Sequence, residues 1–366
     1  MASAYSVWAS VTPGLEKVLA DELAELGVRG RQMEGGIEAS MDGATLGKIL
    51  LSSRVAAGVR VRVGRFHATN LDQLAAGVRA LPWPRFVFPR QPVKVSATLH
   101  RCKMRVRENI EGKVGHAITD ALRVPRLPGP RPPRTPLLVS IRGEDDQFTV
   151  SVDAAGEPMY HRGWRLEGGR APLRETLAAA VLRLAGFRAG EALMDGMCGS
   201  GTFVIEAATA SAGIAPGSRR DFAATTWPDA ISLPRLSGKG VPGPVLCGSD
   251  RDPAAIDLAI RNAARAGVTR GTNFQVADVA SLQPCAPTGL LVANPPYGER
   301  LGSDVVGVYQ ALGRLAAGPF RAWRVAVVVP GPEARLLRAL SPDAEVHATF
   351  KNGGLRVALA VVPTSG

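Results

Sequence analysis

From residue 170 onward, the sequence repeats one pattern, in which a short strand-like run ends in a polar residue and a helix-like stretch follows. The runs are EALMD (191–195), VLCGSD (245–250), NFQVAD (273–278), GLLVAN (289–294) and WRVAVVV (323–329). This alternation predicts a doubly wound α/β domain with a parallel sheet, whose ligand site lies beyond the carboxyl ends of the strands. Near the C-terminus, EVHATF and LRVALAVV flank Lys-Asn-Gly-Gly and predict a final antiparallel hairpin.

Three of these runs end in an aspartate: Asp195, Asp250 and Asp278. A carboxylate after the second strand can bind a ribose diol, and one after the third can accept a hydrogen bond from an adenine amine. Either aspartate alone could instead cap a helix. Three of them at successive strand ends, without the lysine of a P-loop, favour an adenosine ligand that lacks a triphosphate, and S-adenosylmethionine fits that description.

The first run leads through DGMCGSGT (195–202) into the helix-like FVIEAATA. Gly199 and Gly201 allow the backbone to approach a ligand closely, and the start of a helix offers free amides. A dinucleotide fingerprint would place a third glycine where Val204 stands, so the pattern argues against a nicotinamide cofactor. An ordinary strand-to-helix turn is the alternative. The 55-residue step from Asp195 to Asp250 exceeds one helix, and we interpret residues 212–244 as an insertion.

The fourth run ends in Asn294-Pro295-Pro296-Tyr297. Two prolines stop the strand and fix a rigid turn, so the Asn294 amide and nearby backbone carbonyls can converge on one spot beside the Tyr297 ring. This arrangement suits an exocyclic amine on a planar base. Such an amine is a poor nucleophile because its lone pair is delocalised, and fixed carbonyls that accept its hydrogens restore density at the nitrogen as it attacks a methyl group. A plain turn is the alternative.

The first part of the chain carries most of the positive charge. The formal net charge is +12, and residues 85–134 hold twelve basic and three acidic side chains. In this segment Arg101, Lys103, Arg105 and Arg107 alternate with other residues, so on a strand they would form one basic face. A solvated surface is the alternative, but the prevalence of arginine favours contacts with the phosphates of RNA or DNA.

The N-terminal half predicts small mixed α+β units. AYSVWAS is strand-like, residues 13–26 are helix-like, and the strand-like LLVSIRG (137–143) and QFTVSVD (147–153) flank an acidic turn. The proline-rich residues 125–136 must form a loop. A stretch rich in glycine and proline, AAGEPMYHRGWRLEGGRAP, predicts the linker into the second half.

Several classes of protein are excluded by composition. No run of about 18 apolar residues exists, and the opening MASAYSVWAS lacks the features of a secretory signal, so we expect a cytoplasmic protein without a membrane span. The four cysteines are widely spaced and form no C-x-x-C pair, which indicates reduced thiols and no metal site.

The longer motifs MDGMCGSGTFVIEAA, NPPYGERLG, HRGWR and APLRETLAAAVL resemble those of the THUMP-domain RNA guanine-N2 methyltransferases. The sequence is most similar to the 23S ribosomal RNA enzymes, and the tRNA-acting relatives are also similar. The start, VWASVTPGLEKVLADELAELGV, resembles the N-terminal ferredoxin-like unit of that family. Two departures from the motifs are Gly196, where the ribosomal enzymes usually have proline, and Trp164, where the linker motif has tyrosine.

The resemblance implies four segments: a ferredoxin-like domain (1–60), a THUMP RNA-binding domain (61–153), a linker (154–169) and a Rossmann-like class I methyltransferase domain (170–366). It implies S-adenosylmethionine as cofactor and a structured RNA, ribosomal or transfer RNA, as partner. The implied cofactor-binding residues are Pro172, Thr176, Asp195, Met197, Cys198, Gly199, Ser200, Gly201, Thr202, Asp250, Arg251, Asp278, Val279 and Asn294. The implied catalytic residues are Asn294, Pro295, Pro296 and Tyr297, and the residues expected at the RNA are Arg101, Lys103, Arg105, Arg107 and Arg300.

The expected activity is methylation of the exocyclic N2 of a guanosine by a monomeric enzyme. Methylation of adenine N6 or of a protein glutamine remains open, because the box at residues 294–297 is shared among amino-methyltransferases. A noncatalytic RNA-binding assembly factor is a third alternative.

Overall fold

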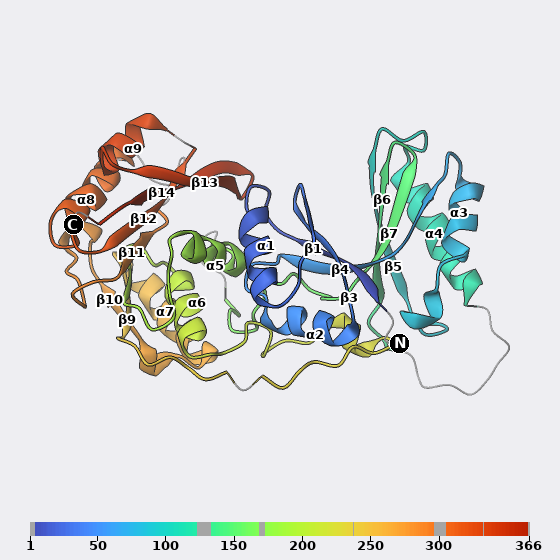
Figure 1. The fold of residues 1–366 in the computed structure, drawn as a ribbon, viewed down its shortest axis with the longest axis horizontal. Helices are drawn as coiled ribbons and strands as arrows, with labels where there is room; N and C mark the ends of the chain where they lie inside the picture. Colours follow the sequence, from blue (N-terminus) through green and yellow to red (C-terminus); the bar gives the residue numbers. More distant parts are fainter. Residues whose placement is uncertain are drawn as a thin grey trace.

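The computed structural model describes residues 4–122, 133–167, 173–236, 238–295, 305–331 and 333–364. These residues form two seven-stranded sheets that lie toward opposite ends of an elongated molecule (Figure 1). The N-terminal sheet extends from the middle of the view to one end, and the C-terminal sheet lies at the other end. The predicted α/β class, with a separate α+β part in front, is confirmed.

The N-terminal sheet has the strand order β2-β3-β1-β4-β7-β6-β5, in which only β5 and β6 pair in parallel. Its strands are β1 (Tyr5–Ser10), β2 (Arg31–Met33), β3 (Gly36–Met41), β4 (Gly58–His67), β5 (Val93–His100), β6 (Leu137–Glu144) and β7 (Gln147–Asp153). Its helices are α1 (Glu16–Glu25), α2 (Gly43–Ser52), α3 (Leu71–Arg79) and α4 (Arg107–Ala121), with a 3-10 turn η1 (Trp83–Arg85). Because β4 continues across the predicted boundary at residues 60/61, both predicted N-terminal units share this sheet.

Local sequence explains these elements. In β1 the apolar Tyr5, Val7 and Ala9 are buried at every second position, as expected for a strand with one covered face. Helix α2 begins after Asp42, whose carboxylate accepts from the Thr45 amide at 2.8 Å. The β6–β7 hairpin is confirmed, and its acidic turn places two aspartates at positive φ, which this residue type tolerates.

The C-terminal sheet has the order β10-β9-β8-β11-β12-β14-β13, with β14 antiparallel to both of its neighbours. Its strands are β8 (Leu193–Asp195), β9 (Leu246–Asp250), β10 (Thr272–Val276), β11 (Leu290–Ala293), β12 (Arg324–Pro330), β13 (Glu345–Asn352) and β14 (Leu355–Val362). The helices are α5 (Glu175–Leu184), α6 (Thr202–Ser211), α7 (Pro253–Ala266), α8 (Val305–Ala317) and α9 (Ala334–Leu340), with 3-10 turns η2 (Ala223–Thr226), η3 (Thr269–Gly271) and η4 (Val279–Ser281). All five predicted strands and the C-terminal hairpin are confirmed.

Both faces of the C-terminal sheet are covered. All four residues of β11 are buried, and they contribute alternately to two separate apolar cores. Leu290 and Val292 belong to one core, whereas Leu291 and Ala293 belong to the other. Burial on two sides is the arrangement expected of parallel strands flanked by helices, and it leaves the ends of the strands as the place for a ligand.

The two sheets are joined through a buried ionic cluster. Glu206 of α6 accepts from Arg162 of the linker at 3.1 Å and from Arg54, just after α2, at 3.2 Å. The Arg162 guanidinium also donates to the Arg54 carbonyl at 2.6 Å. Glu206 and Arg162 are each 2% exposed, so the cluster is held away from water. A helix of the C-terminal domain is thereby fixed to the N-terminal part.

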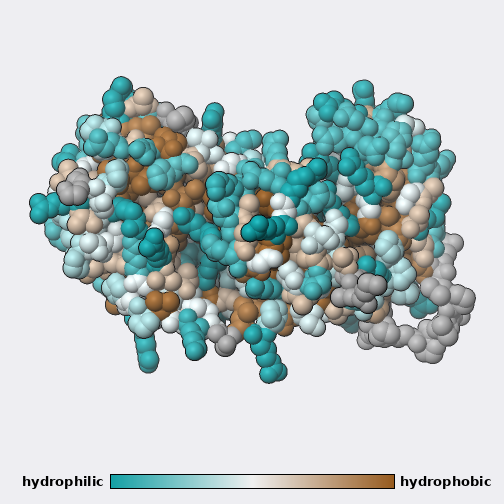
Figure 2. Space-filling model, viewed as in Figure 1, coloured by the Kyte–Doolittle hydropathy of each residue, from teal (hydrophilic) through white to brown (hydrophobic). Residues whose placement is uncertain are grey.

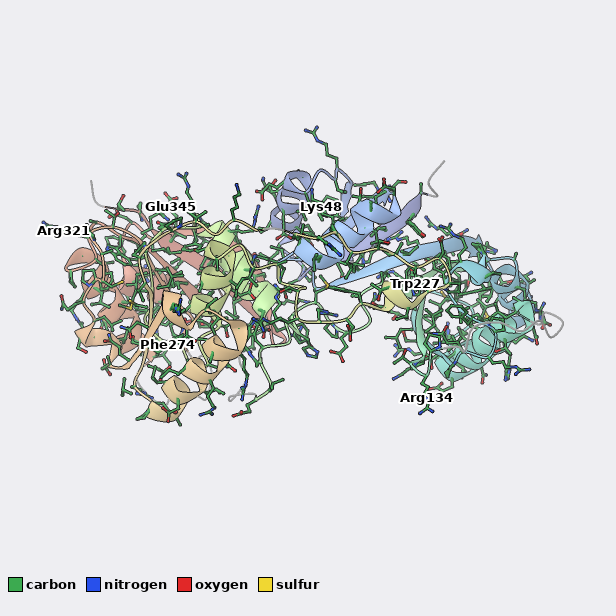
Figure 3. All side chains as sticks on the ribbon, turned by 90° about the horizontal axis from the view of Figure 1, so that it is seen from below. Lys48, Arg134, Trp227, Phe274, Arg321 and Glu345 are labelled. Atoms are coloured by element: carbon green, nitrogen blue, oxygen red, sulfur yellow. The ribbon has the colours of Figure 1, made fainter. Side chains whose placement is uncertain are left out.

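The predicted insertion, residues 212–244, contains η2 as its one helical turn within the described residues. Figure 1 shows this segment, which we call the strap, running along the lower edge from the C-terminal domain to the middle of the molecule. Its Asp229 accepts from the Tyr5 hydroxyl at 2.8 Å and from Arg85 at 3.0 Å. The ring of Trp227 packs edge to face on that of Phe86, with 5.2 Å between the ring centroids. Figure 3 shows Trp227 where the two predicted N-terminal units meet. The strap therefore links the C-terminal domain to β1 and to the η1 region of the N-terminal half.

No helix of the described residues is long and apolar enough to cross a membrane. In the same part of the chain, no group of three or more His, Cys, Asp or Glu side chains could hold a metal ion. Cys102, Cys198 and Cys247 are buried free thiols, and Cys285 is an exposed one.

Candidate active site at the carboxyl edge of the C-terminal sheet

Three strand ends meet where the sequence predicted a ligand site. In the parallel pairing, Asp195 of β8 lies opposite Gly248 of β9 and Val292 of β11. Asp250 lies two residues after Gly248, and Asn294 lies two residues after Val292. Both therefore lie just beyond Asp195 at the same edge of the sheet. The loop after β8 is bonded to both neighbours, because the Cys198 amide donates to the Ser249 carbonyl at 2.8 Å and the Gly196 amide to the Val292 carbonyl at 3.0 Å.

The glycines of this loop have two separate roles. Gly201 precedes α6 with φ 84°, a conformation that favours glycine, and a Cβ there would also be tight, at 3.1 Å from both the Ala259 Cβ and the Phe274 ring. Gly199 also has a positive φ, 50°, but a Cβ there would meet no atom within 4 Å. The backbone at Gly199 therefore borders open space beside a helix N-terminus, and this is the cradle that a ligand would fill.

Asp250 holds this cradle in shape. One carboxylate oxygen accepts from the Gly199 amide at 2.9 Å, and the other accepts from the Asp252 amide at 3.0 Å. Each oxygen keeps a free lone pair, and the side chain is half-buried. Asp250 can thus orient the glycine loop and still accept hydrogen bonds from a diol.

Asp195 is the most perturbed acid at this edge. It is 1% exposed, and burial, opposed by the hydrogen bond from the Met197 amide and assisted by the charge of Asp250, raises its pKa to about 8. The carboxyl group is therefore largely protonated at neutral pH. A cation placed beside it would lower this pKa. The neighbouring Cys198 thiol has a raised pKa, mainly because it is buried, and is a poor nucleophile.

Asn294 has a buried side-chain oxygen, Oδ1, that lacks a hydrogen-bond donor among the described residues. A buried amide oxygen without a partner costs free energy, and such costs persist at sites where a ligand supplies the missing donor. Pro295 follows as a buried residue. The other members of the predicted box, Pro296 and Tyr297, lie outside the described residues, as does Arg300.

The third predicted acid lies slightly apart from the others. Strand β10 ends at Val276, and Asp278 is an exposed cap that accepts from the Ala280 amide at 2.8 Å at the start of η4. It reaches the same edge through the Ala277 amide, which donates to the Asp250 carbonyl at 3.0 Å. Val279 is half-buried and Arg251 is exposed. All of these positions remain available to a ligand at the edge.

Arg165 was missed by the sequence reasoning, although it ends the motif HRGWR. Its guanidinium donates to the Thr202 hydroxyl at 2.5 Å and to the Leu173 carbonyl at 3.2 Å, and it lies 3.1 Å from Glu175. It thus ties the starts of α5 and α6 to the linker. Thr176, the next residue on α5, is buried, and Pro172 lies outside the described residues.

Of the residues predicted to bind RNA, Arg101, Lys103, Arg105 and Arg107 are exposed but do not form a strand. β5 ends at His100, residues 101–106 form a loop, and Arg107 is the first residue of α4. The expectation of a basic strand face is wrong, because Arg101 has φ 50° and makes a bidentate ion pair with Asp145 at 2.7 and 2.8 Å. Figure 2 shows hydrophilic residues gathered over this end of the molecule, where the β6–β7 turn lies. The loop at residues 101–106 and the start of α4 belong to the N-terminal half, away from the Asn294 edge.

The class of the protein follows from this site and from the strand order. A β10-β9-β8-β11-β12-β14-β13 sheet with an antiparallel β14, a glycine loop after β8 and acids after β8 and β9 define an S-adenosylmethionine-dependent methyltransferase. The family can also be stated. The family model described as the RMKL-like methyltransferase domain matches residues 162–357, just over half of the chain, and the chain belongs to this family. A second model, the RlmL ferredoxin-like domain, matches residues 6–60.

A curated relative supports the same family assignment. The Ribosomal RNA large subunit methyltransferase K/L of Syntrophotalea carbinolica is 35% identical over 356 residues, which cover 89% of this chain and 49% of that protein. The chain thus spans about half the length of this curated relative.

Two solved structures are similar over almost their whole length. SMU.472, described as a methyltransferase and solved with SAH, has a TM-score of 0.87 and 26% identity, covering 100% of both chains. A protein predicted to be an N6-adenine-specific DNA methylase, from Listeria monocytogenes, has a TM-score of 0.84 and 27% identity, covering 99% of this chain and 97% of the other. The predicted family, fold class and cofactor are confirmed.

Proposed function

We propose that this chain transfers a methyl group from S-adenosylmethionine to the exocyclic N2 of a guanosine in a structured RNA, with ribosomal RNA as the favoured substrate. The observation that carries the proposal is the buried, unpartnered Oδ1 of Asn294 at the end of β11. That atom needs a donor, and an amine on a base has two hydrogens to donate. The name of the S. carbinolica relative supports ribosomal RNA.

The cofactor fits the edge of the sheet in this proposal. The open space at Gly199, the amides at the start of α6 and the two acids give acceptors and donors where a nucleoside and an amino acid are needed. Residues 195–202 would hold the methionine part, Asp250 with Arg251 the ribose, and Asp278 with Val279 the adenine. Pro172 and Thr176 would cover the cofactor. When bound, it supplies an electrophilic methyl group on a sulfonium.

The catalytic role falls to the turn after β11. The Asn294 Oδ1 and the Pro295 carbonyl would accept the two hydrogens of the amine, so that its lone pair points at the methyl group. Accepting these hydrogens raises the electron density at nitrogen in the transition state more than in the ground state, and this is how fixed dipoles lower a barrier. Pro296 would keep the turn rigid and Tyr297 would stack on the base.

The target base must leave its stack to reach this turn, since a paired base keeps its amine inside the helix. The loop residues Arg101, Lys103, Arg105 and Arg107, together with Arg300, remain our predicted contacts to the RNA. The alternative of adenine N6 is supported by the description of the Listeria protein, and a protein glutamine would also fit the four-residue box. The basic N-terminal half favours RNA over both. The complete sequence of the box at residues 294–297, together with the glycine loop, speaks against a noncatalytic assembly factor.

One experiment separates these activities. The purified chain is incubated with methyl-labelled S-adenosylmethionine and, in parallel, with deproteinised ribosomal RNA, bulk tRNA, DNA or total protein. Nucleosides and amino acids from each digest are then separated. We expect label in N2-methylguanosine from RNA. Label in N6-methyladenine or in protein alone would overturn the guanine assignment, and no transfer at all would overturn the enzyme assignment.

A further inference from the structure

The N-terminal sheet has one apolar face and one polar face. The buried Val7, Val61, Val152 and Val139 lie side by side across β1, β4, β7 and β6. Because successive residues of a strand point to opposite sides, the positions between them form the other face. On that other face, residues that pair across neighbouring strands form rows, and we call three adjacent rows the open face.

The middle row consists almost entirely of serine. Register places Ser40, Ser6, Arg62, Ser151, Ser140 and Ser96 next to one another across six strands. At about 4.8 Å per strand, this row extends roughly 24 Å. Ser151 is 7% exposed, whereas the other five residues of the row are exposed or half-buried. Their side chains offer donors on both sides of Ser151, and the serine hydroxyl groups are short enough for an extended chain to come close to the sheet. Arg62 is the one long side chain in the row.

The rows on either side carry more arginine. One contains Arg65, Thr149, Arg142 and Thr98, from β4 through β5. The register shift between Arg62 and Gly64 is what places Arg65 here, because without this bulge Gly64 would follow Arg62 on the open face. The opposite row contains Arg31, Glu38, Trp8, Arg60 and Asp153.

The open face has an excess of positive charge. Its three rows hold five arginines and two acids. Glu38 lies 2.7 Å from Arg62 and 3.8 Å from Arg31, and Asp153 lies 3.7 Å from Arg60. Arg142 pairs with Glu144 of its own strand at 3.3 Å, whereas Arg65 has no ion-pair partner among the described residues. The pKa of Arg62 is lowered, first by burial and then, against the attraction of Glu38, by repulsion from Arg65, Arg31 and Arg142. The guanidinium groups are therefore close enough to repel one another, and an anion would relieve this repulsion.

The chemistry of the face points to a phosphate chain and not to a protein surface. None of the large exposed apolar side chains of the described residues lies on it, so it offers little apolar surface to a protein partner. Trp8 is half-buried beneath the Arg62 guanidinium at 4.9 Å. Arginine, serine and threonine are the side chains that most often contact phosphate and sugar oxygens.

We propose that the open face is the surface that binds the sugar-phosphate backbone of the RNA substrate, in addition to the loop at residues 101–107. This inference rests on the proposed function, because it names where the substrate of that activity is held. The bound segment crosses the sheet along the serine row, and its phosphates lie between the arginines of the two flanking rows.

The test compares three double variants in affinity for deproteinised ribosomal RNA at several salt concentrations. Arg65→Gln with Arg142→Gln removes two exposed charges from the open face. Arg79→Gln with Arg321→Gln is the matched control, since it removes two exposed charges from helix α3 and from the C-terminal domain. Lys103→Gln with Arg105→Gln tests the loop. Adenosylhomocysteine binding and thermal unfolding verify that each variant is folded.

For the open-face variant we expect the slope of log affinity against log salt to fall by about 1.4, from about 0.7 for each of two lost phosphate contacts. Taking equal affinities at 1 M salt, affinity at 0.1 M salt should then fall about 25-fold. The KM for RNA should rise while kcat is retained, and Arg65→Lys with Arg142→Lys should restore most of the slope. An unchanged slope, or a loss equal to that of the control, overturns the open-face assignment. If the wild-type chain methylates no RNA, the proposed function fails instead, and this result is read independently of the variants.

Discussion

The two seven-stranded sheets place their polar groups differently: the C-terminal sheet has them at one edge, and the N-terminal sheet has them on one face. In the C-terminal sheet, both faces are buried under helices and the polar groups are concentrated at one edge, where Asp195, Asp250 and Asn294 meet. In the N-terminal sheet, one face is buried and the other carries rows of serine and arginine. An edge brings a few groups to one point, which suits chemistry on one atom. A face distributes many weak donors over tens of ångströms, which suits a long charged partner.

The largest expected effect comes from breaking the connection between the two sheets. Glu206→Ala would leave the buried Arg162 and the partly buried Arg54 without their shared carboxylate. Removing one partner of a buried ionic cluster costs about 3–5 kcal/mol, so we expect a clear fall in the unfolding midpoint in urea. Glu34→Ala, at an exposed turn, is the control and should change little. A midpoint within error of wild type would mean that the cluster contributes no stability and that other contacts, such as the strap and the ion pair between Arg183 of α5 and Glu25 of α1, hold the sheets together.

The next effect isolates the chemistry of the edge. Asn294→Ala should lower kcat by about 100- to 1000-fold, the usual consequence of losing one preorganised hydrogen-bonding group in a transition state. Binding of adenosylhomocysteine, measured by calorimetry, should stay near the wild-type value. Asn273→Ala, on exposed β10, is the matched control. Loss of cofactor binding with normal turnover at saturation would reverse the role assigned to Asn294.

Cofactor affinity should depend on Asp250. Asp250→Ala removes the acceptor for the Gly199 amide and the predicted partner of the ribose, and hydrogen bonds to a charged group contribute about 1.5–3 kcal/mol each. We therefore expect the Kd for adenosylhomocysteine to rise about 10- to 100-fold. Asp257→Ala, exposed on α7, should bind normally. Equal affinity in both variants would contradict the assignment of the ribose site to Asp250.

The last prediction concerns pH. Asp195 has a pKa of about 8 in the fold against 3.8 as its ordinary value, so the folded state binds the extra proton between these values. The contribution of this group to stability is therefore present at low pH and declines as pH rises toward 8. Between pH 6 and 9, the unfolding midpoint of the wild type should decline more than that of Asp195→Asn. Parallel curves would show that Asp195 does not titrate in this range.

The C-terminal sheet could be predicted from the sequence more completely than the N-terminal one. Parallel strands buried on two sides, such as 289–294, are short continuous apolar runs, and each ends in a residue that marks the edge. Alternation misled at residues 101–107, because a basic residue at every second position occurs on a loop as readily as on a strand. The ion pair between Arg101 and Asp145 joins residues that are 44 positions apart. Nothing local in the sequence predicts it.

The open face and the role of Arg165 could not be predicted from the sequence for a similar reason. The serine row contains one residue from each of six strands, so it exists only in the register of the folded sheet. Arg165 lies in a motif that was noted, but its hydrogen bond to Thr202 depends on the folded path of the linker. Residues that act through long-range pairing leave little trace in a single sequence.

The strap has a practical consequence for anyone who divides this molecule. Phe222, Trp227 and Ile231 belong to the C-terminal half by sequence, but they are buried where the strap meets the linker, η1 and α2. A fragment that starts at residue 162 would keep these three apolar side chains and lose α2 and η1, which help to cover them. Such a fragment would expose apolar side chains that are buried in the whole chain. If it aggregated, the cause would be the position of the cut and not an inability of the C-terminal sheet to fold.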